Sequence, residues 1–332
     1  MSGCLYSMRK GIVPALRRYK YSAMLTTIIK RLLQGVLVLL AVLVVTFVLL
    51  RLIPGDPARI MAGNADEEVV EQLREEMGLN DPIPVQFVDY MKDIFKGDMG
   101  YSYFAKDDVT NVIVNAYKPT LIMIALALPS AIILGLLFGL IAAVFKETII
   151  DRLISAFAVL VQSAPNYWVA VMMIQIVAVK LRWLPASGYK GIEYAIMPAI
   201  VLGLPLAGVF ARSVRVNMLG SMQQNFSKAA KARGVPYFTT LMGYSFRNVL
   251  VPFLTLVGSQ LGFMVGNCLV IESIFGYPGL GLQILNAILR RDYFLVQGLV
   301  AMLAAIFIII NTFIDISYLY LDPRIRKAQG GL

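Results

Sequence analysis

The feature that most constrains this chain is a set of six long apolar segments. A helix needs roughly 20 apolar residues to cross a bilayer core of about 30 Å. Six segments have that length: residues 32–50, 120–145, 154–179, 195–214, 249–271 and 297–320. Hydrophobic residues make up 58% of the 332 and charged residues only 15%, which is typical of polytopic membrane proteins. We therefore predict an all-α membrane protein with six transmembrane helices.

Basic residues predict how these helices are oriented. The stretch before the first apolar segment has no Asp or Glu but carries Arg9, Lys10, Arg17, Arg18, Lys20, Lys30 and Arg31. By the positive-inside rule the N-terminus is cytoplasmic, and six crossings return the C-terminus to the same side. The formal net charge of +10 thus reflects topology, because the basic residues sort by membrane side rather than onto one helix face. Nucleic-acid binding is not expected.

Residues 54–118 form a long connection that we place outside the membrane. Its acidic residues cluster between Asp66 and Glu76. A helix is expected at 67–77, and another within the segment LNDPIPVQFVDYMKDIFKGDMGYS. Connections in compact domains have a median of about 4–6 residues, so this one is expected to contact a partner or to gate a pathway.

A basic, alanine-rich segment, NFSKAAKARGVPYFTTLMGYSFRNVLVP, separates the fourth and fifth apolar segments. Asn225 can cap a short helix, Gly234 can adopt a positive φ just past its end, and Pro236 prevents continuation. The small side chains of Ala229 and Ala230 would allow a partner surface to approach closely. A merely solvated charged connection would account for the basic residues but not for this combination. We therefore predict a docking element.

Neutral polar residues within the apolar segments are candidates for a wet pathway. They include Gln162, Ser163, Asn166, Gln260 and Asn267. The alternative is that they hold helices together, at about 0.6 kcal/mol per hydrogen bond. The same two interpretations apply to Glu272 and Asp315, which lie near the ends of their segments.

Several classes of function require residues that this chain lacks. It has no histidine, so zinc HExxH sites and Ser-His or Cys-His dyads cannot be built. It has no GxxxxGK[ST] loop, so we do not expect it to bind or hydrolyse ATP by itself. We also expect it to bind no metal and no other cofactor. An intramembrane enzyme is therefore not favoured. A stand-alone secondary transporter is also not favoured, because inverted repeats and matched intramembrane carboxylates are not evident.

From Met24 to Arg326 the chain resembles the membrane subunit of peptide-class ABC importers, the dipeptide, oligopeptide and nickel permease family. The segments that carry the resemblance are RLIPGDPARIMAG, GLNDPIPVQF, KGDMGYS, MPAIVLGLPLAGVFARSVR, KAAKARG, FRNVLVP, ESIFGYPGLG, RRDYFLVQG and LDPRIR. Lys228 stands where the general docking motif of such permeases has Glu. The end of that motif also differs, because residues 244–247 read YSFR.

The resemblance implies a type I importer fold in the cytoplasmic membrane of a prokaryote. It implies four partners: a second homologous permease, two ATPase subunits that bind ATP and Mg, and an extracytoplasmic substrate-binding protein. The coupling helix and its turn would comprise Lys228, Ala229, Ala230, Lys231, Arg233 and Gly234. Di- or oligopeptides are the expected substrates, with nickel chelates, glutathione or opines as alternatives.

These inferences divide the chain into five parts. We expect an N-terminal tail at 1–23, a first transmembrane helix at 24–53 and the extracytoplasmic loop at 54–118. A core transmembrane domain with five helices would follow at 119–321, with its cytoplasmic coupling loop at 217–248. A cytoplasmic C-terminal tail would occupy 322–332.

Overall fold

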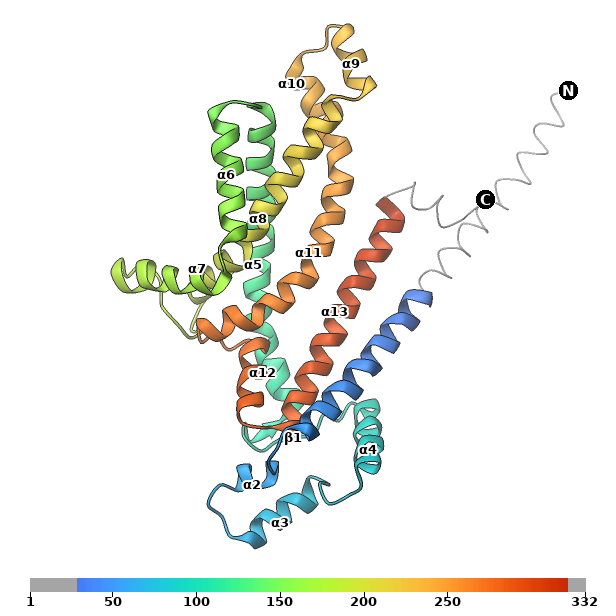
Figure 1. Ribbon diagram of the computed structural model, residues 1–332, viewed down its shortest axis with the longest axis vertical. Coiled ribbons are helices and arrows are strands. Elements are labelled where there is room, and N and C mark those ends of the chain that lie inside the picture. The colour runs from blue at the N-terminus through green and yellow to red at the C-terminus, as the bar shows by residue number, and fades with distance from the viewer. Residues whose placement is uncertain (1–28, 322–332) are drawn as a thin grey trace, which may run out of the picture.

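The computed structural model describes residues 29–321, and the side chains as far as residue 312. The expected tails at 1–23 and 322–332 lie outside the described residues. Five helical stretches are long and apolar enough to cross a membrane (Figure 1): the first helix Ile29–Leu52, α5 (Val109–Val144), α8 (Glu193–Met222), the stretch Tyr237–Ile274 and the start of α13 (Tyr293–Leu321). The stretch Tyr237–Ile274 combines α10 (Tyr237–Thr239), the π-helical η2 (Thr240–Ser245) and α11 (Phe246–Ile274). The chain is thus an all-α membrane protein.

The predicted span at 154–179 is not one straight helix, because the chain turns sharply in its middle. Helix α6 (Ile149–Ser163) and the next helix meet at an angle of 100°. That next helix is α7 (Asn166–Met173), which continues as the π-helical η1 (Ile174–Lys180). Pro165 explains the turn, because proline disfavours helical backbone at the preceding residue, and Ala164 is extended with ψ of 127°. Six spans are obtained only if α6 and α7 count as one.

Helices α5 and α8 pack closely because small residues face one another. Gly135 and Gly139 form a GxxxG pattern on α5. A Cβ atom at Gly139 would lie 2.6 Å from the carbonyl oxygen of Ala211 on α8. A Cβ at Gly135 would lie 2.3 Å from Cβ of Phe210. The two backbones therefore approach to a distance that only glycine permits at these positions.

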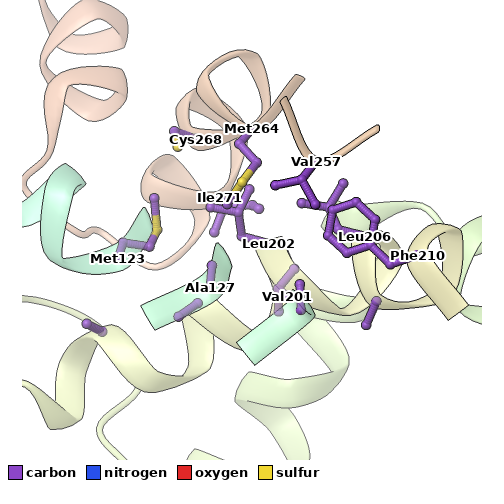
Figure 2. Close-up of a cluster of buried hydrophobic side chains, with 14 of the residues drawn as sticks. Met123, Ala127, Val201, Leu202, Leu206, Phe210, Val257, Met264, Cys268 and Ile271 are labelled. Carbon is purple, nitrogen blue, oxygen red and sulfur yellow. The ribbon is translucent and has the colours of Figure 1, made fainter. Parts of the chain in front are cut away.

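The main apolar core lies where α5, α8 and α11 meet. Figure 2 shows Met123 of α5, Leu202 of α8 and Met264 of α11 in this cluster. Phe210 of α8 and Phe253 of α11 pack edge to face, with ring centroids 5.4 Å apart. These three helices form the scaffold on which the polar residues described below are placed.

The segment between the first helix and α5 folds into three short helices and a small hairpin. Its helices are α2 (Pro57–Ala62), α3 (Glu67–Glu76) and α4 (Ile83–Lys96), and its strands are β1 (Tyr101–Ser102) and β2 (Asp107–Asp108), which pair antiparallel. Helix α5 begins at Val109, so the connection is shorter than the predicted 54–118. The apolar signal begins only near residue 120, because the first turns of α5 are polar.

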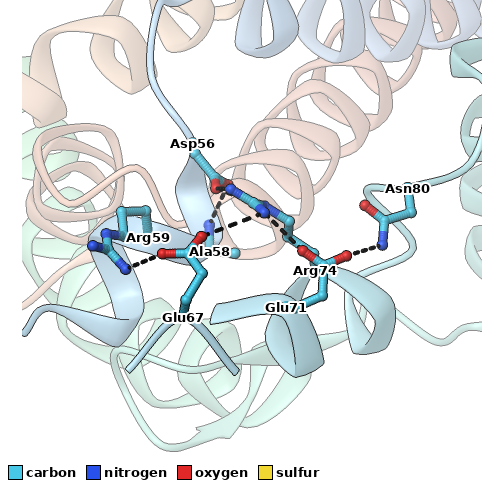
Figure 3. A network of polar contacts seen from close by, with 7 residues as sticks. All are labelled: Asp56, Ala58, Arg59, Glu67, Glu71, Arg74 and Asn80. Atoms are coloured by element: carbon cyan, nitrogen blue, oxygen red, sulfur yellow. Dashed lines mark hydrogen bonds and ion pairs between the residues drawn. The ribbon is translucent and has the colours of Figure 1, made fainter. Parts of the chain in front are cut away.

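Part of the acidic cluster is neutralised within this segment. The guanidinium of Arg74 lies 2.6 Å from Asp56 and 2.7 Å from Glu71 (Figure 3). Arg59 lies 2.9 Å from Glu67. Hydrogen bonds from Arg74 hold the pKa of Glu71 below its usual range. The network ties α3 to the chain just after the first helix.

After α11 the chain makes a tight turn into α12 (Leu280–Leu289), a helix that the sequence did not predict. Gly276 has a φ of +53° in this turn. Helix α12 lies beside α5 in the half of the molecule that also holds α2–α4 (Figure 1). The chain then enters α13, four residues before the predicted span at 297–320.

Candidate functional site

The predicted docking segment folds as a helix, a turn and a second helix at one end of the molecule (Figure 1). Helix α9 spans Asn225–Ala232. Gly234 adopts a φ of +75° just past the end of α9, as expected. The expected cap is wrong by one position: Gln224 is the N-cap residue, its side chain makes no capping hydrogen bond, and Asn225 is the first helical residue.

Ala229 and Ala230 differ in burial. Ala230 is only 1% exposed and packs against the protein's own chain, whereas Ala229 is exposed. Ser227, on the same face of α9 as Ala230, is also fully buried. The sequence predicted that both alanines contact a partner. Which face of a short helix is buried depends on tertiary packing, so the sequence alone could not separate them. Only Ala229 of this pair is accessible to another subunit.

The accessible face of the segment is cationic. Lys228, Lys231, Arg233 and Gly234 are exposed together with Ala229. The ammonium of Lys231 lies 6.0 Å from the ring centroid of Tyr237. No Asp or Glu occurs between Tyr194 and Ile271 to offset these charges from within the segment. This face suits a partner surface that carries carboxylates and accepts close approach at Ala229.

Helix α9 is connected to two long helices through a sulfur atom. The hydroxyl groups of Ser227 on α9 and Ser245 on η2 donate to the sulfur of Met222 at the end of α8, at 3.8 and 3.0 Å. These contacts place α9 against both α8 and the helical stretch that begins at Tyr237. The π-helical η2 lies at this junction, and π-helical turns often occur at functional sites.

A buried ion pair braces the same end of α8. Arg215 donates to both carboxylate oxygens of Asp151 at 2.5 and 2.7 Å, a bidentate geometry. The Asp151 side chain at the start of α6 is 3% exposed, and that of Arg215 is 28% exposed. The pair fixes α6 to α8 near α9. The sequence alone did not predict this pair.

A cavity of about 270 Å³ lies at the break between α6 and α7. Four of the five candidate pathway residues line it: Gln162, Asn166, Gln260 and Asn267. The amide of Asn166 donates to Asn267 at 2.9 Å, which joins α7 to α11. Apolar side chains and Pro205 of α8 complete the wall. The arrangement presents neutral amides in an otherwise apolar surface.

The remaining candidates lie elsewhere. Ser163 is exposed and is not among the residues that line the cavity. Glu272 is fully buried but accepts hydrogen bonds from Thr120 at 2.7 Å and from the backbone N–H of Gly281 at 2.7 Å. It thus caps the N-terminus of α12 and is not among the cavity-lining residues. The side chain of Asp315 lies outside the described residues.

A third buried carboxylate, Asp292, was not predicted from the sequence. It accepts hydrogen bonds from the Ser102 hydroxyl at 2.5 Å and from the Leu295 backbone at 3.1 Å, so it joins β1 to the start of α13. Burial raises the pKa of Asp292. Its neighbours reinforce the contact: Arg290 packs over the ring of Phe104 at 3.3 Å, and Arg291 donates to the carbonyl of Pro54. Asp292 lies in the segment RRDYFLVQG, which was noted in the sequence, but its partner Ser102 lies 190 residues away.

Comparison with known proteins identifies the chain. Residues 135–327 match the family described as the binding-protein-dependent transport system inner membrane component, and residues 24–125 match its N-terminal domain. The chain is 36% identical over 304 residues to the glutathione transport system permease protein GsiC of Pectobacterium atrosepticum, covering 91% of this chain and 99% of that protein. It is 33% identical over 308 residues to a probable peptide ABC transporter permease of Sinorhizobium fredii, covering 90% of this chain and 98% of that protein. Permeases of this kind work with separate ATPase subunits and a substrate-binding protein. The chain therefore belongs to the binding-protein-dependent permeases and is a multi-pass, non-enzymatic subunit of an ABC importer of the peptide and nickel class.

Proposed function

We propose that this chain imports di- or oligopeptides across the inner membrane of a bacterium, as one of two homologous permease subunits in its transporter. The name of the relative in Sinorhizobium fredii supports peptides. Glutathione, itself a small peptide, is the second candidate, because the relatives in Pectobacterium atrosepticum and Escherichia coli are named glutathione permeases. Nickel chelates and opines are further alternatives within the class.

The observation that carries the proposal is the separation of two unlike ends with a cavity between them. Helix α9 and its cationic face lie at one end, and α2–α4 with their acidic residues lie at the other (Figure 1). Under the positive-inside rule the α9 end is cytoplasmic, as are both termini. Two ATPase subunits would then bind on the cytoplasmic side, one of them at α9, and the substrate-binding protein would deliver its cargo at α2–α4.

The packing around α9 supports a coupling role for Lys228, Ala229, Lys231, Arg233 and Gly234. Closure of the ATPase subunits would displace α9, and the contacts at Met222 would pass that displacement to α8 and α11. Helices α8 and α11 both line the cavity at the break between α6 and α7, so that cavity would open alternately to the two sides of the membrane. ATP and Mg would be bound by the ATPase subunits, and this chain would bind no cofactor.

The cavity residues Gln162, Asn166, Gln260 and Asn267 are proposed to line the translocation path. Amide side chains both donate and accept hydrogen bonds, so they can replace water around the peptide groups of a passing substrate. Because they are neutral, they hold neither terminus of a peptide strongly. This suits passage of many peptides rather than selection of one.

The coupling assignment is tested by placing a carboxylate on the accessible face of α9. In the complete transporter, Ala229→Asp should reduce copurification of the ATPase subunits and substrate uptake, because it buries an unpaired charge in the contact. The matched control is Thr110→Asp, which adds the same charge at an exposed position at the opposite end. A second variant, Ala230→Asp, should instead lower the amount of folded protein, since Ala230 is buried within the chain. Normal ATPase binding and uptake for Ala229→Asp would refute the assignment.

The substrate is tested through the binding protein and through uptake. Purified binding protein should be screened against dipeptides, longer peptides, glutathione, nickel chelates and opines, and the tightest ligands should be followed in proteoliposomes. Dipeptide uptake that requires ATP supports the proposal. Uptake of glutathione alone replaces it with the second candidate.

A further inference from the structure

A second cavity, of about 240 Å³, lies at the opposite end of the molecule from α9. Helix α4, the turn before it and the start of α13 form most of its wall, and Arg51 at the end of the first helix contributes from the side. The volume is below the roughly 300–1,000 Å³ common for drug-sized ligands, so an occupant must be small.

Two buried polar atoms at this cavity have no hydrogen-bond partner among the described residues. They are Nε2 of Gln297 and the hydroxyl oxygen of Tyr90. Gln297 is only 4% exposed, and both residues line the cavity. A buried polar atom without a partner costs about 1–3 kcal/mol, so a ligand or a water molecule in the cavity that reached these two atoms would be stabilised.

Arg51 adds a cation whose charge is not balanced within the described part of the chain. Its guanidinium donates to the neutral side-chain oxygen of Gln86 at 3.0 and 2.7 Å. It also packs over the ring of Phe47, at 3.3 Å from the centroid. No carboxylate of the described residues forms an ion pair with it. Arg51, Tyr90 and Gln297 thus offer donors to an anionic group.

Five acidic residues also line the cavity: Glu76, Asp81, Asp89, Asp93 and Asp98. Asp89 and Asp93 are paired with lysines on α4, at 2.8 and 3.1 Å. Three others have no cationic partner among the described residues: Glu76, Asp81 and Asp98. No group of three or more His, Cys, Asp and Glu in the described part of the chain could hold a metal ion. An organic ammonium group is therefore favoured over a metal.

We propose that this cavity binds a small zwitterion, a free amino acid or a dipeptide, before or apart from its passage through the membrane. The carboxylate of the ligand accepts hydrogen bonds from Arg51, Tyr90 and Gln297. The ammonium group lies among Glu76, Asp81 and Asp98. The choice of peptide as ligand class rests on the proposed function, whereas the two-ended recognition rests on the cavity alone.

Binding is measured by calorimetry on the complete transporter in lipid nanodiscs, without binding protein and without ATP, using dialanine as probe. We expect saturable binding, and at least tenfold weaker binding of alaninamide, which lacks the carboxylate, and of N-acetylalanine, which lacks the ammonium group. Tyr90→Phe and Gln297→Leu should each weaken dialanine binding at least fivefold. The control Tyr101→Phe, at an exposed ring outside the cavity, should bind as the parent does.

The two variants also separate a ligand site from a structural one. Each removes a polar atom that has no protein partner, so the thermal stability of the ligand-free protein should stay unchanged or rise. Absence of saturable dialanine binding, or equal binding by parent and both variants, overturns the inference. So does a result in which the variants weaken only the docking of the binding protein, because the cavity is then part of a protein interface.

The outcome is independent of the transport assay. If the transporter imports only glutathione and dialanine still binds with the expected dependence on Tyr90 and Gln297, the site stands and the proposed peptide substrate falls. If dipeptides are imported but dialanine does not bind here, the proposed function stands and this site falls.

Discussion

The ion pair between Asp151 and Arg215 gives a quantitative test of how α6 is held to α8. The perturbation is Arg215→Met, which keeps most of the side-chain volume but leaves the carboxylate of Asp151 buried without its cation. Two unit charges about 4 Å apart attract by about 4 kcal/mol at an effective dielectric constant of about 20. Removing one partner of a buried pair costs about 3–5 kcal/mol. Asp151 keeps hydrogen bonds from the Glu147 backbone and from Ser155, so we expect a loss near 3 kcal/mol.

The assay is the free energy of unfolding of the purified subunit, measured by titration from a mild detergent into SDS. Lys92→Met is the matched control, because Lys92 and Asp89 form a pair whose side chains are 60% and 51% exposed. Exposed pairs contribute about 0.2–1 kcal/mol, so this control should change stability little. The double variant Arg215→Met with Asp151→Leu should recover most of the loss, since a buried pair can be replaced by apolar side chains at little cost.

Equal losses of unfolding free energy for Arg215→Met and Lys92→Met, within about 0.5 kcal/mol, would refute this prediction. Free-energy changes of independent variants usually add to within about that amount. The prediction also fails if the double variant is less stable than Arg215→Met alone. Either result would mean that α6 and α8 are held by apolar packing and that the pair adds nothing measurable.

Three further outcomes are expected. Gly139→Leu should reduce the yield of folded protein far more than Gly220→Leu, because a Cβ at Gly139 would lie 2.6 Å from the Ala211 carbonyl and no atom lies within 4 Å at Gly220; expression and gel filtration measure this. A cysteine at Glu71 should react with a membrane-impermeant thiol reagent in intact cells and one at Lys228 should not, both sites being exposed. Burial raises the pKa of Asp292. The protonated form of Asp292 therefore contributes stability below about pH 4, and this contribution is lost as the pH rises through the pKa of Asp292 in the folded protein. Asp292→Asn should flatten this pH dependence of the free energy of unfolding.

Much of the architecture follows from length and apolarity alone. A run of roughly 20 apolar residues has few ways to satisfy its backbone in a bilayer, so helices at these positions could be predicted. The α9 segment could also be predicted as a short helix ended by Gly234, because the positive φ there is a local requirement. Local rules of this kind do not need the rest of the fold.

The break between α6 and α7 shows where such rules end. Pro165 was visible as an interruption, but prolines also lie inside α5 and α8, whose helices continue through them. Whether a proline breaks a helix depends on whether neighbouring groups can form hydrogen bonds with the backbone carbonyl that the proline leaves free. Long-range contacts also bear on such helices: the hydroxyl of Tyr277 donates to the carbonyl of Pro119 in α5 at 3.1 Å, from 158 residues away. No local pattern predicts that contact.

The candidate sites were predictable to different degrees. Polarity within apolar segments was enough to select Gln162, Asn166, Gln260 and Asn267, although not to show that they share one cavity. The division between Ala229 and Ala230 could not be predicted, because it depends on how α9 sits on α8 and η2. The partners of Asp292 and Glu272 were also out of reach, since Ser102 and Thr120 lie 190 and 152 residues away.

The placement of buried charge bears on where substrate choice resides. Among residues whose burial the structure describes, the buried carboxylates are Asp151, Glu272 and Asp292. Each is engaged in holding the fold: Asp151 pairs with Arg215, Glu272 caps α12, and Asp292 caps α13. None of them lines the cavity at the break between α6 and α7, which presents amides instead. An unpaired carboxylate there would bind the ammonium end of a peptide and slow its release. If this cavity is the translocation path, as proposed above, a neutral lining avoids that penalty, and we expect discrimination between substrates to occur before the substrate enters the membrane.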